Sequence, residues 1–520
     1  MPSPHRPGDG SLPVLPPGFA VGVDADGLGL TRAPGARDCA TAAADVGRLA
    51  GLGVTSARVA LSWPRLQPSG AGPLEETEAR HVDLLLDALA AAGIRPSVTL
   101  HDGVLPEPLQ ADGGWLNRAT ADRLADLAAL AGERWGDRVE HWVPVDQPAR
   151  LLVEGHMTGR AAPGLSLAFD ALPVAHHLLL AHGRAVLALR ATARGRSPVA
   201  PPGRGAADPL ADPATAADPL ADPLVDPLAD PLADPLVDGA VTGPSIGCAN
   251  HHAPMWPASE DVADVAATKL HDALWNALFL EPMLLGRYPV DLQPLLEGVV
   301  RDGDLATIRQ PLDFYGVTYD SPLKIGIAGE ESEVPFERCE LLGYPETDAG
   351  TPVVPDALRE WLIMFRARYR AALPPLQVTL APAPYVEPAT PADAGTPGTT
   401  TLAPDGPDGP DGSDGSDGSD GSDGSDGSDG SDLPVDPRTS RLEGHLRAVA
   451  TAVQRGVDVR ALHVGPLLDQ AAASATDAGP AGALAPVGLL AVDPVDGART
   501  PRPAYHWLAA VVGAQTRSLG

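Results

Sequence analysis

The chain has 520 residues, of which 44% are apolar, so it is long enough for one large domain or two ordinary ones. Its net charge of −31 argues against nucleic acid, whose phosphates need Lys and Arg, and against anionic membrane surfaces. The three cysteines, Cys39, Cys248 and Cys339, are widely spaced and indicate neither a disulfide framework nor a zinc site.

Short apolar segments alternate with longer helical patterns along the chain. The expected strands are 18–24, 55–62, 95–102, 139–146, 245–252, 312–319, 376–382 and 459–468. The expected helices are 38–52, 77–93, 119–135, 168–193, 259–285, 356–372, 440–456 and 503–512. Eight strand–helix units are the number that closes a (β/α)8 barrel. The sequence therefore predicts an α/β fold, a single-domain (β/α)8 TIM barrel over 18–515, after a disordered N-terminus at 1–17.

Two low-complexity acidic insertions interrupt this pattern, at 204–242 and 388–437. The first repeats Asp-Pro-Leu with period four and holds eight Asp over 208–238; the frequent proline excludes an α-helix and favours an extended linker. The second settles into Gly-Ser-Asp and holds ten Asp over 405–432, which predicts a solvated, disordered coil. A calcium role for this Asp ladder is the weaker alternative, because its period of three lacks the nonapeptide pattern of calcium β-rolls. Both insertions are expected in the loops after strands four and seven.

The N-terminus has no basic start followed by an apolar run, so the sequence indicates no signal peptide. No stretch of 18 apolar residues is present that would predict a membrane span. We therefore expect a cytoplasmic protein without a membrane partner. Nothing in the sequence identifies a protein partner.

Eight segments resemble glycoside hydrolase family 1, the β-glucosidase family, in the right order: 51–76, 92–118, 133–148, 159–164, 175–186, 276–289, 312–319 and 346–358. One of them, "ERWGDRVEHWVPVDQP" (133–148), covers the place where the family reads Trp-x-Thr-x-Asn-Glu-Pro. The resemblance extends over about 18–513, apart from the insertions. It implies a retaining β-glycosidase ancestry, a β-glucoside or other small sugar as ligand, and no cofactor.

The two catalytic glutamates of this family are not matched. The acid/base Glu after strand four is replaced by Gln147, and the nucleophile Glu after strand seven, in Thr-Glu-Asn-Gly, is replaced by Leu380 in "VTLAP". At the first position this chain resembles the thioglucosidases of the same family, whose leaving group departs without protonation. Those enzymes, however, keep the second Glu. An amide has no acidic proton and leucine has no nucleophilic atom, so both steps of the double displacement lose their side chain.

The sugar-binding positions are degenerate as well. Asp102 and Gly103 replace a His-Trp, Asp146 the Asn before the acid, Asp320 a supporting Tyr, and Thr351 the Trp of the aglycone platform. The family's first-strand Gln matches near Gly29, and "GPLLDQAAA" (465–473) loses a Glu and both Trp. Arg58, which the resemblance places beside the nucleophile, is kept, as are the packing residues Trp63, Trp115, Trp142, Tyr288 and Trp507.

New chemistry at the strand ends is the alternative to a decayed pocket. Asp102, Asp146 and Asp320 are candidates for an acidic cluster above Arg58, although the simpler interpretation is solvated residues. A metal site from His101, His251 and Asp102, with His252 on the same strand, is disfavoured because adjacent strand residues point in opposite directions. Glu387 is a substitute nucleophile only if its loop refolds.

Three hypotheses remain. The first is a hydrolytically inactive pseudoenzyme that keeps a binding, regulatory or scaffolding role. The second is a residual or altered β-glycosidase that uses Asp146 as acid and an unaligned carboxylate as nucleophile. The third is an inert barrel whose acidic repeats tether partners.

Overall fold

The computed structural model describes residues 15–25, 28, 39–194, 244–385, 436–471, 484–493 and 496–518. Most of both predicted insertions, and residues 1–14 of the predicted disordered N-terminus, lie outside the described residues. Two predicted boundaries are wrong. Leu15 is buried in the main core, and the Asp436 carboxylate accepts a hydrogen bond from Thr439 N at the start of a helix, so both belong to the barrel.

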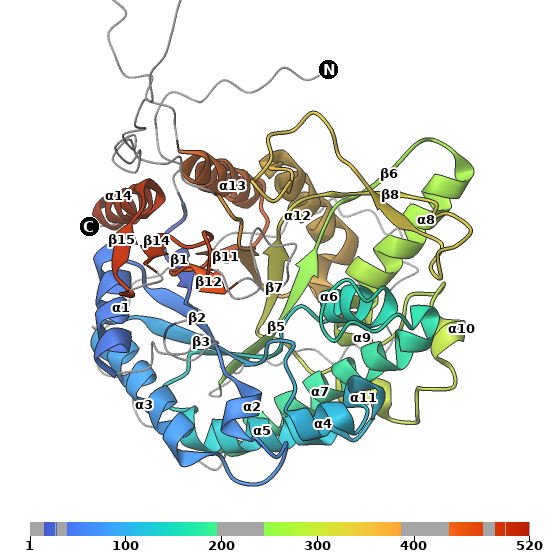
Figure 1. Ribbon diagram of the computed structural model, residues 1–520, viewed down its shortest axis with the longest axis horizontal. Helices are drawn as coiled ribbons and strands as arrows, with labels where there is room; N and C mark the ends of the chain where they lie inside the picture. Colours follow the sequence, from blue (N-terminus) through green and yellow to red (C-terminus); the bar gives the residue numbers. More distant parts are fainter. Residues whose placement is uncertain are drawn as a thin grey trace, which may run out of the picture.

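Eight parallel strands form a closed barrel in the order β1-β11-β10-β7-β5-β4-β3-β2, which confirms the predicted fold (Figure 1). The strands are β1 Ala20–Asp24, β2 Ser56–Ala60, β3 Arg95–His101, β4 His141–Val145, β5 Ser245–His252, β7 Phe314–Tyr319, β10 Leu376–Leu380 and β11 Val459–Val464. Every residue of β2, β7 and β10 is buried. Burial on both faces explains why these strands read as continuous apolar runs in the sequence.

Helices surround the barrel strands, as the ribbon in Figure 1 shows. The longer ones are α1 Cys39–Leu52, α3 Glu76–Ala91, α5 Thr120–Trp135, α7 Leu172–Arg194, α8 Val262–Asp272, α12 Pro355–Tyr369, α13 Pro437–Gln454 and α14 Pro503–Ser518. The predicted helix 259–285 is not continuous. After α8 it passes through the π-helix η4 Ala273–Ala277, where Leu278 N donates to Ala273 O, and resumes as α9 Leu280–Leu285.

Shorter elements lie at the rim that the C-terminal ends of the strands form. Helical turns there include α2 Trp63–Leu66, α4 Glu107–Ala111, η1 Gly114–Leu116, α6 Pro148–Arg150 and the π-helix η2 Leu151–Met157. A small three-stranded sheet forms from β6 Met255–Pro257, β8 Leu323–Gly326 and β9 Glu337–Cys339. The remaining elements are η3 Ala168–Ala171, α10 Gln293–Leu296, α11 Asp304–Ile308, η5 Arg370–Ala372, and the pairs β12 Gln470–Ala471 with β13 Leu484–Ala485 and β14 Leu490–Val492 with β15 Arg499–Pro501.

The two insertions leave the barrel at opposite ends. The second one interrupts the connection from β10 to α13, which starts at the C-terminal rim. The first one departs from the end of α7 and returns at β5, so it interrupts a helix-to-strand connection at the N-terminal rim. The prediction that both insertions follow the catalytic strands is therefore wrong for the first.

One described segment, Ala168–Ala193, is long and apolar enough to cross a membrane by composition alone. Its most apolar window is 78% buried within the protein, because α7 packs against α5, α11 and the barrel strand β4. This burial is typical of a core helix, whose apolar surface is covered by the protein itself.

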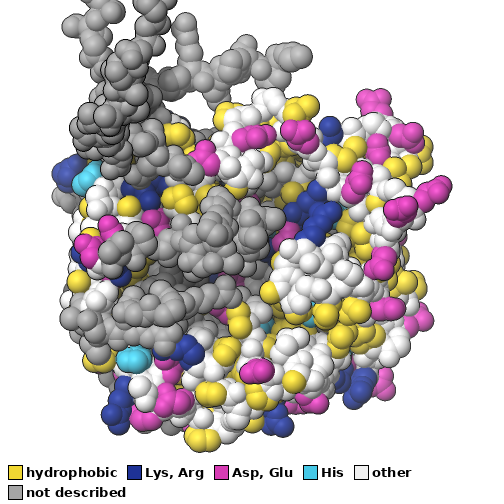
Figure 2. Space-filling view, viewed as in Figure 1, with side chains coloured by type: hydrophobic (Ala, Val, Ile, Leu, Met, Phe, Trp, Pro, Cys, Tyr) yellow, Lys and Arg dark blue, Asp and Glu magenta, His cyan; other side chains and the backbone are white. Residues whose placement is uncertain are grey.

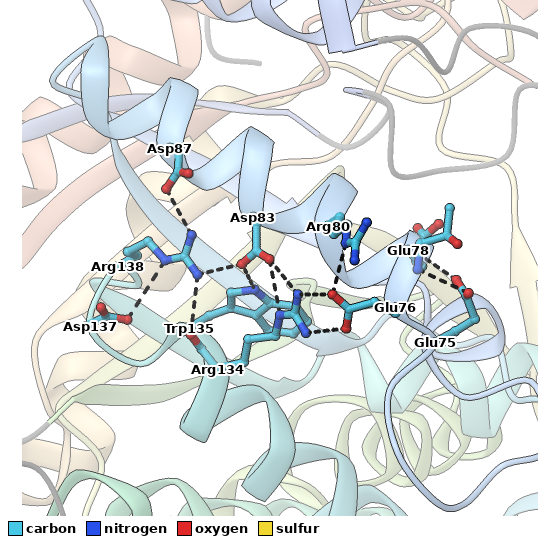
Figure 3. Close-up of polar contacts among 11 residues, drawn as sticks. Glu75, Glu76, Glu78, Arg80, Asp83, Asp87, Arg134, Trp135, Asp137 and Arg138 are labelled. Carbon is cyan, nitrogen blue, oxygen red and sulfur yellow. Dashed lines mark hydrogen bonds and ion pairs between the residues drawn. The ribbon is translucent and has the colours of Figure 1, made fainter.

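A network of ion pairs joins α3 to the C-terminal end of α5 on the outside of the barrel (Figure 3). Asp83 accepts hydrogen bonds from Arg134, Arg138 and the Trp135 indole, at 2.6 to 2.9 Å. Only 25% of its side chain is exposed. Desolvation opposes ionisation of this carboxyl, but the hydrogen bonds from the two arginines and the indole outweigh it and lower its pKa. The Asp83 carboxylate therefore holds α3 and the C-terminal end of α5 together.

We expect Asp83→Ala to lower the free energy of unfolding by about 1–3 kcal/mol at neutral pH, because three donors lose their charged acceptor. Asp87→Ala is the matched control: Asp87 is 64% exposed and pairs with Arg138 alone, so its loss costs less than about 0.5 kcal/mol. Urea unfolding followed by circular dichroism measures both. The folded pKa of Asp83 is lowered, so its contribution is complete above its unfolded pKa and is lost as pH falls through the folded pKa. Equal costs for the two variants at pH 7 would contradict this account.

Candidate functional site at the barrel mouth

The ends of β2, β4 and β10 are joined by a buried polar contact. Arg58 on β2 donates from Nη1 to Thr379 Oγ1 at 3.0 Å, and its Nη2 lies 3.3 Å from Asp146 Oδ2, just after β4. The two charged side chains are 8% and 12% exposed. Arg58 therefore lies next to the residue that precedes Leu380, and it compensates the charge of Asp146.

Gln147, the residue that the resemblance assigns to the acid/base position, has a left-handed backbone conformation with φ of 47°. Its backbone N donates to Ala249 O at 2.8 Å on the neighbouring β5, which ties the end of β4 to the barrel. Its side-chain amide donates to Asp146 Oδ2 over 3.4 Å. A positive φ is uncommon for a residue other than glycine and is found most often at functional or strained positions. The unusual backbone conformation of Gln147 is therefore fixed by its hydrogen bond to β5, and its amide side chain cannot act as an acid.

Leu380 is the last residue of β10 and is completely buried. It belongs to the main hydrophobic core and lies in register with Tyr319 on β7. The Tyr319 hydroxyl donates to Val354 O at 2.9 Å, so it is satisfied by the backbone. The position that the resemblance assigns to the nucleophile is therefore occupied by packed hydrocarbon.

Asp320 follows β7 at the same rim, and its side chain is half-buried. The protein around it desolvates the carboxyl and raises its pKa above the usual range, against the opposing charges of Arg441, Arg150 and Arg338. Arg441 itself is buried and donates to Ala381 O at 2.9 Å. The surroundings of Asp320 therefore favour its protonated form.

The two predicted residues at the end of β3, His101 and Asp102, lie in different environments. Asp102 is exposed, whereas His101 is buried and its Nε2 accepts a hydrogen bond from the Trp115 indole at 3.2 Å. Burial lowers the pKa of His101 to about 3, so the ring is neutral at physiological pH. The structure therefore brings Asp146 to Arg58 and leaves Asp102 on the surface.

The two histidines at the end of β5 point in opposite directions. His252 is hydrogen-bonded through its two ring nitrogens to Asn276 and to the Tyr315 hydroxyl, and it stacks near Trp361. His251 meets Trp275 edge-on at 5.4 Å. Burial lowers the pKa of both rings. Among the residues that the structure describes, no group of three or more His, Cys, Asp or Glu is arranged to hold a metal ion.

Thr351, which the resemblance assigns to the aglycone platform, is hydrogen-bonded to a residue four positions earlier in the chain. It exchanges backbone hydrogen bonds with Thr347, which accepts through its hydroxyl and donates from its backbone N. Glu387 and Gly29 lie outside the described residues. Sequence reasoning missed Thr379 as a partner of Arg58. The alternation of side chains along β10 is the signal for it, since Thr379 and Leu380 must point to opposite sides.

Comparisons with known proteins agree with the barrel. Residues 37–201 match the model of glycosyl hydrolase family 1. β-Glucosidase A of Acetivibrio thermocellus is 28% identical over 61% of this chain and 62% of its own length, and thermostable β-glucosidase B of Thermobispora bispora is 30% identical over 62% and 58%. The matches thus span about three fifths of these curated relatives. The family 1 β-glucosidase of Thermotoga maritima in complex with isofagomine lactam has a TM-score of 0.70 at 22% identity, covering 97% of this chain and 100% of that one.

The contact between Arg58 and Asp146 predicts a measurable coupling. We expect Arg58→Met and Asp146→Asn each to destabilise the protein, and the double variant to cost less than their sum by at least about 1 kcal/mol, because either single change leaves a buried group without its partner. Urea unfolding of the four proteins measures the coupling. The exposed pair Arg80–Glu76, with 72% and 55% exposed side chains, is the control and gives about 0.5 kcal/mol or less. Strictly additive effects at Arg58 and Asp146 would show that their contact has no energetic role.

The raised pKa of Asp320 predicts a pH-dependent gain from its neutral isostere. A folded pKa above the unfolded one makes stability fall as pH rises between the two values. Asp320→Asn therefore stabilises the protein at neutral pH, and the gain disappears below the unfolded pKa of about 4. Thermal unfolding at several pH values measures it, with the exposed Asp102→Asn as control. A variant of Asp320 that is less stable than wild type at pH 7 would contradict the prediction.

Proposed function

We propose that this chain, whose matches support membership of glycosyl hydrolase family 1, is a β-glucosidase-like barrel that does not hydrolyse glycosides by the double displacement of that family. The observation that carries the proposal is the pair of side chains at the ends of β4 and β10. Gln147 and Leu380 stand there, and neither is a carboxylate. The remaining role is binding, regulation or scaffolding.

The chemistry of retaining glycosidases needs both groups at once. One carboxyl must carry a proton for the leaving oxygen, and a second must be ionised and about 5 Å away to attack the sugar. The amide of Gln147 is able to hydrogen-bond a hydroxyl or a water. The buried Leu380 supplies neither charge nor a lone pair, and it removes the covalent intermediate on which the second step depends.

A small sugar is the ligand class that the relatives support. Solved structures of the Thermotoga maritima enzyme carry isofagomine lactam and deoxynojirimycin, as their titles state. In this chain the predicted sugar contacts are replaced by Asp102, Asp146, Asp320 and Thr351, so we propose a weak sugar site that needs no cofactor. The overall charge of −31 makes nucleic acid an unsuitable partner.

A second candidate, an altered glycosidase, is favoured by one observation. Asp320 carries a raised pKa because of desolvation, which is what a general acid needs. Asp146, the acid suggested by sequence alone, is paired with Arg58 and is better suited to accept hydrogen bonds. In this alternative Asp320 gives its proton to the leaving oxygen as the glycosidic bond breaks, and an unaligned carboxylate forms the new bond to the anomeric carbon, which water then hydrolyses.

Hydrolysis of an activated aryl β-glucoside tests the proposal, because its leaving group needs little protonation. We expect no turnover by wild type, and weak turnover by Leu380→Glu combined with Gln147→Glu. Leu380→Gln is the matched control: it has nearly the same size as Leu380→Glu without the nucleophilic carboxylate. Circular dichroism must accompany the series, because a carboxylate at this fully buried position costs stability.

Turnover by wild type that Asp320→Asn or Asp146→Ala abolishes would replace the non-hydrolytic proposal by the altered glycosidase. Calorimetric titration with deoxynojirimycin tests the sugar site separately. Binding without turnover supports a pseudoenzyme that has kept its ligand. No binding and no turnover would remove the sugar from the proposal and leave a scaffolding role.

A further inference from the structure

Positive charge gathers at one place beside the barrel mouth of this acidic protein. Figure 2 shows Lys and Arg side chains grouped on this face, close to where α6 lies in Figure 1. Arg150 ends α6, Arg338 lies on β9, and Arg160 follows η2. These three residues are called the rim arginines below. The pKa of Arg338 is lowered first by partial desolvation, with 31% of its side chain still exposed, and then by the charges of Arg160 and Arg150, against the attraction of Glu154.

One carboxylate is shared between two of the rim arginines. Glu154 Oε1 lies 2.8 Å from Arg338 Nη2, and Glu154 Oε2 accepts from Arg150 Nε, also at 2.8 Å. Both oxygens of Glu154 are therefore used by these two guanidinium groups. The Arg338 guanidinium also lies over the Trp275 ring, 5.0 Å from its centroid, which holds it in place.

Arg160 is held close to this pair by the backbone. Ala161 N donates to Glu154 O at 3.0 Å, and Leu165 N donates to Gly155 O at 2.9 Å. A Cβ on Gly155 would lie 2.5 Å from Ala162 O, so only glycine lets the loop approach η2 this closely. Within the described part of the chain, the contacts of Arg160 are electrostatic ones with Arg338 and His271, and none is a hydrogen bond or an ion pair.

A small cavity lies between these groups. It is lined by Val153, Glu154, Thr158, Arg160, His271, Phe336, Glu337 and Arg338, and it has room for about one water molecule. His271 is 1% exposed and its Nδ1 has no hydrogen-bond partner among the described residues. The ring stacks on Trp275 at 5.6 Å, and burial lowers its pKa to about 3, so it is neutral. An unpartnered buried nitrogen in a cavity bordered by two guanidinium groups indicates a missing polar group.

We propose that Arg160 and Arg338, with Thr158 and His271 at the cavity, form a binding site for a small oxyanion, a phosphate or carboxylate group. The anion lies at the mouth of the cavity, and only one of its oxygen atoms enters the space for about one water molecule. A guanidinium matches such a group with two parallel hydrogen bonds, and a hydroxyl with a neutral imidazole N–H adds neutral donors. Glu154 fixes Arg338 and Arg150 but leaves Arg160 for the ligand. Glu337 also lines the cavity and limits the charge of the ligand that fits.

The total charge of the chain opposes long-range attraction of any anion. Recognition must therefore come from short-range hydrogen bonds, which salt screens weakly when the partners are partly buried. This site differs in position and chemistry from Gln147 and Leu380, and it does not depend on whether glycosides are hydrolysed.

Calorimetric titration of the full-length protein with inorganic phosphate at constant ionic strength tests the site, with acetate and citrate as separate arms that distinguish phosphate from carboxylate ligands. We expect saturable binding of at least one of these anions at one site per chain. Arg160→Ala weakens it at least about tenfold, because it removes charge-assisted hydrogen bonds without disturbing a described contact. Arg80→Ala, an exposed change on α3, is the matched control and leaves binding unchanged.

Arg338→Gln is the second variant, with thermal unfolding as a check because Arg338 also supports Glu154. Loss of binding in a folded Arg338→Gln protein agrees with the proposal, and if that variant does not fold, Arg160→Ala decides alone. The proposal is overturned if wild type shows no saturable binding of any of the three anions. It is equally overturned if Arg160→Ala binds as wild type does, or if Arg80→Ala loses as much affinity.

Discussion

Closure of the sheet is the constraint on which the rest of this protein depends. β1 pairs with β2 on one side and with β11 on the other, so the first and last barrel strands meet and no edge strand remains. Closure of a parallel barrel also brings all eight strand ends to one rim. Residues that are hundreds of positions apart, such as Arg58 and Thr379, become neighbours only because of it.

A polar framework stabilises the mouth of the barrel. The end of β4 carries a left-handed residue, Gln147, whose backbone is bonded to β5, and Arg58 reaches the end of β10. Leu380 is buried as hydrocarbon at the end of β10, and Asp146 gives Arg58 a carboxylate partner. A guanidinium at this depth needs such a partner, because an unpaired buried charge is costly. The contact between Arg58 and Asp146 therefore contributes to the structure of the mouth.

Carboxylates shared by two arginines occur both on the outer helices and at the rim. Between α3 and α5, Asp83 accepts hydrogen bonds from both Arg134 and Arg138. Beside α6, Glu154 serves Arg150 and Arg338 in the same way, but Arg160 lies near them without an ion pair among the described residues. Two π-helical segments, η2 and η4, flank this place, and such segments occur frequently at functional sites. The additional guanidinium of Arg160 marks the rim as the place to look for a ligand.

The sequence alone determined the barrel. Buried parallel strands are continuous apolar runs and helices have a period of 3.6, so eight strand–helix units can be counted without coordinates. The assignment of Gln147 and Leu380 to the catalytic positions comes from the resemblance and stays a prediction. Only the tertiary structure decided which charged side chains meet. Arg58 pairs with Asp146, whereas Asp102 is exposed. Desolvation raises the pKa of Asp320, and Arg160 and Arg338 line the same cavity. These outcomes depend on the direction and burial of side chains on strands that are far apart in the chain. Local sequence patterns predict neither of these properties.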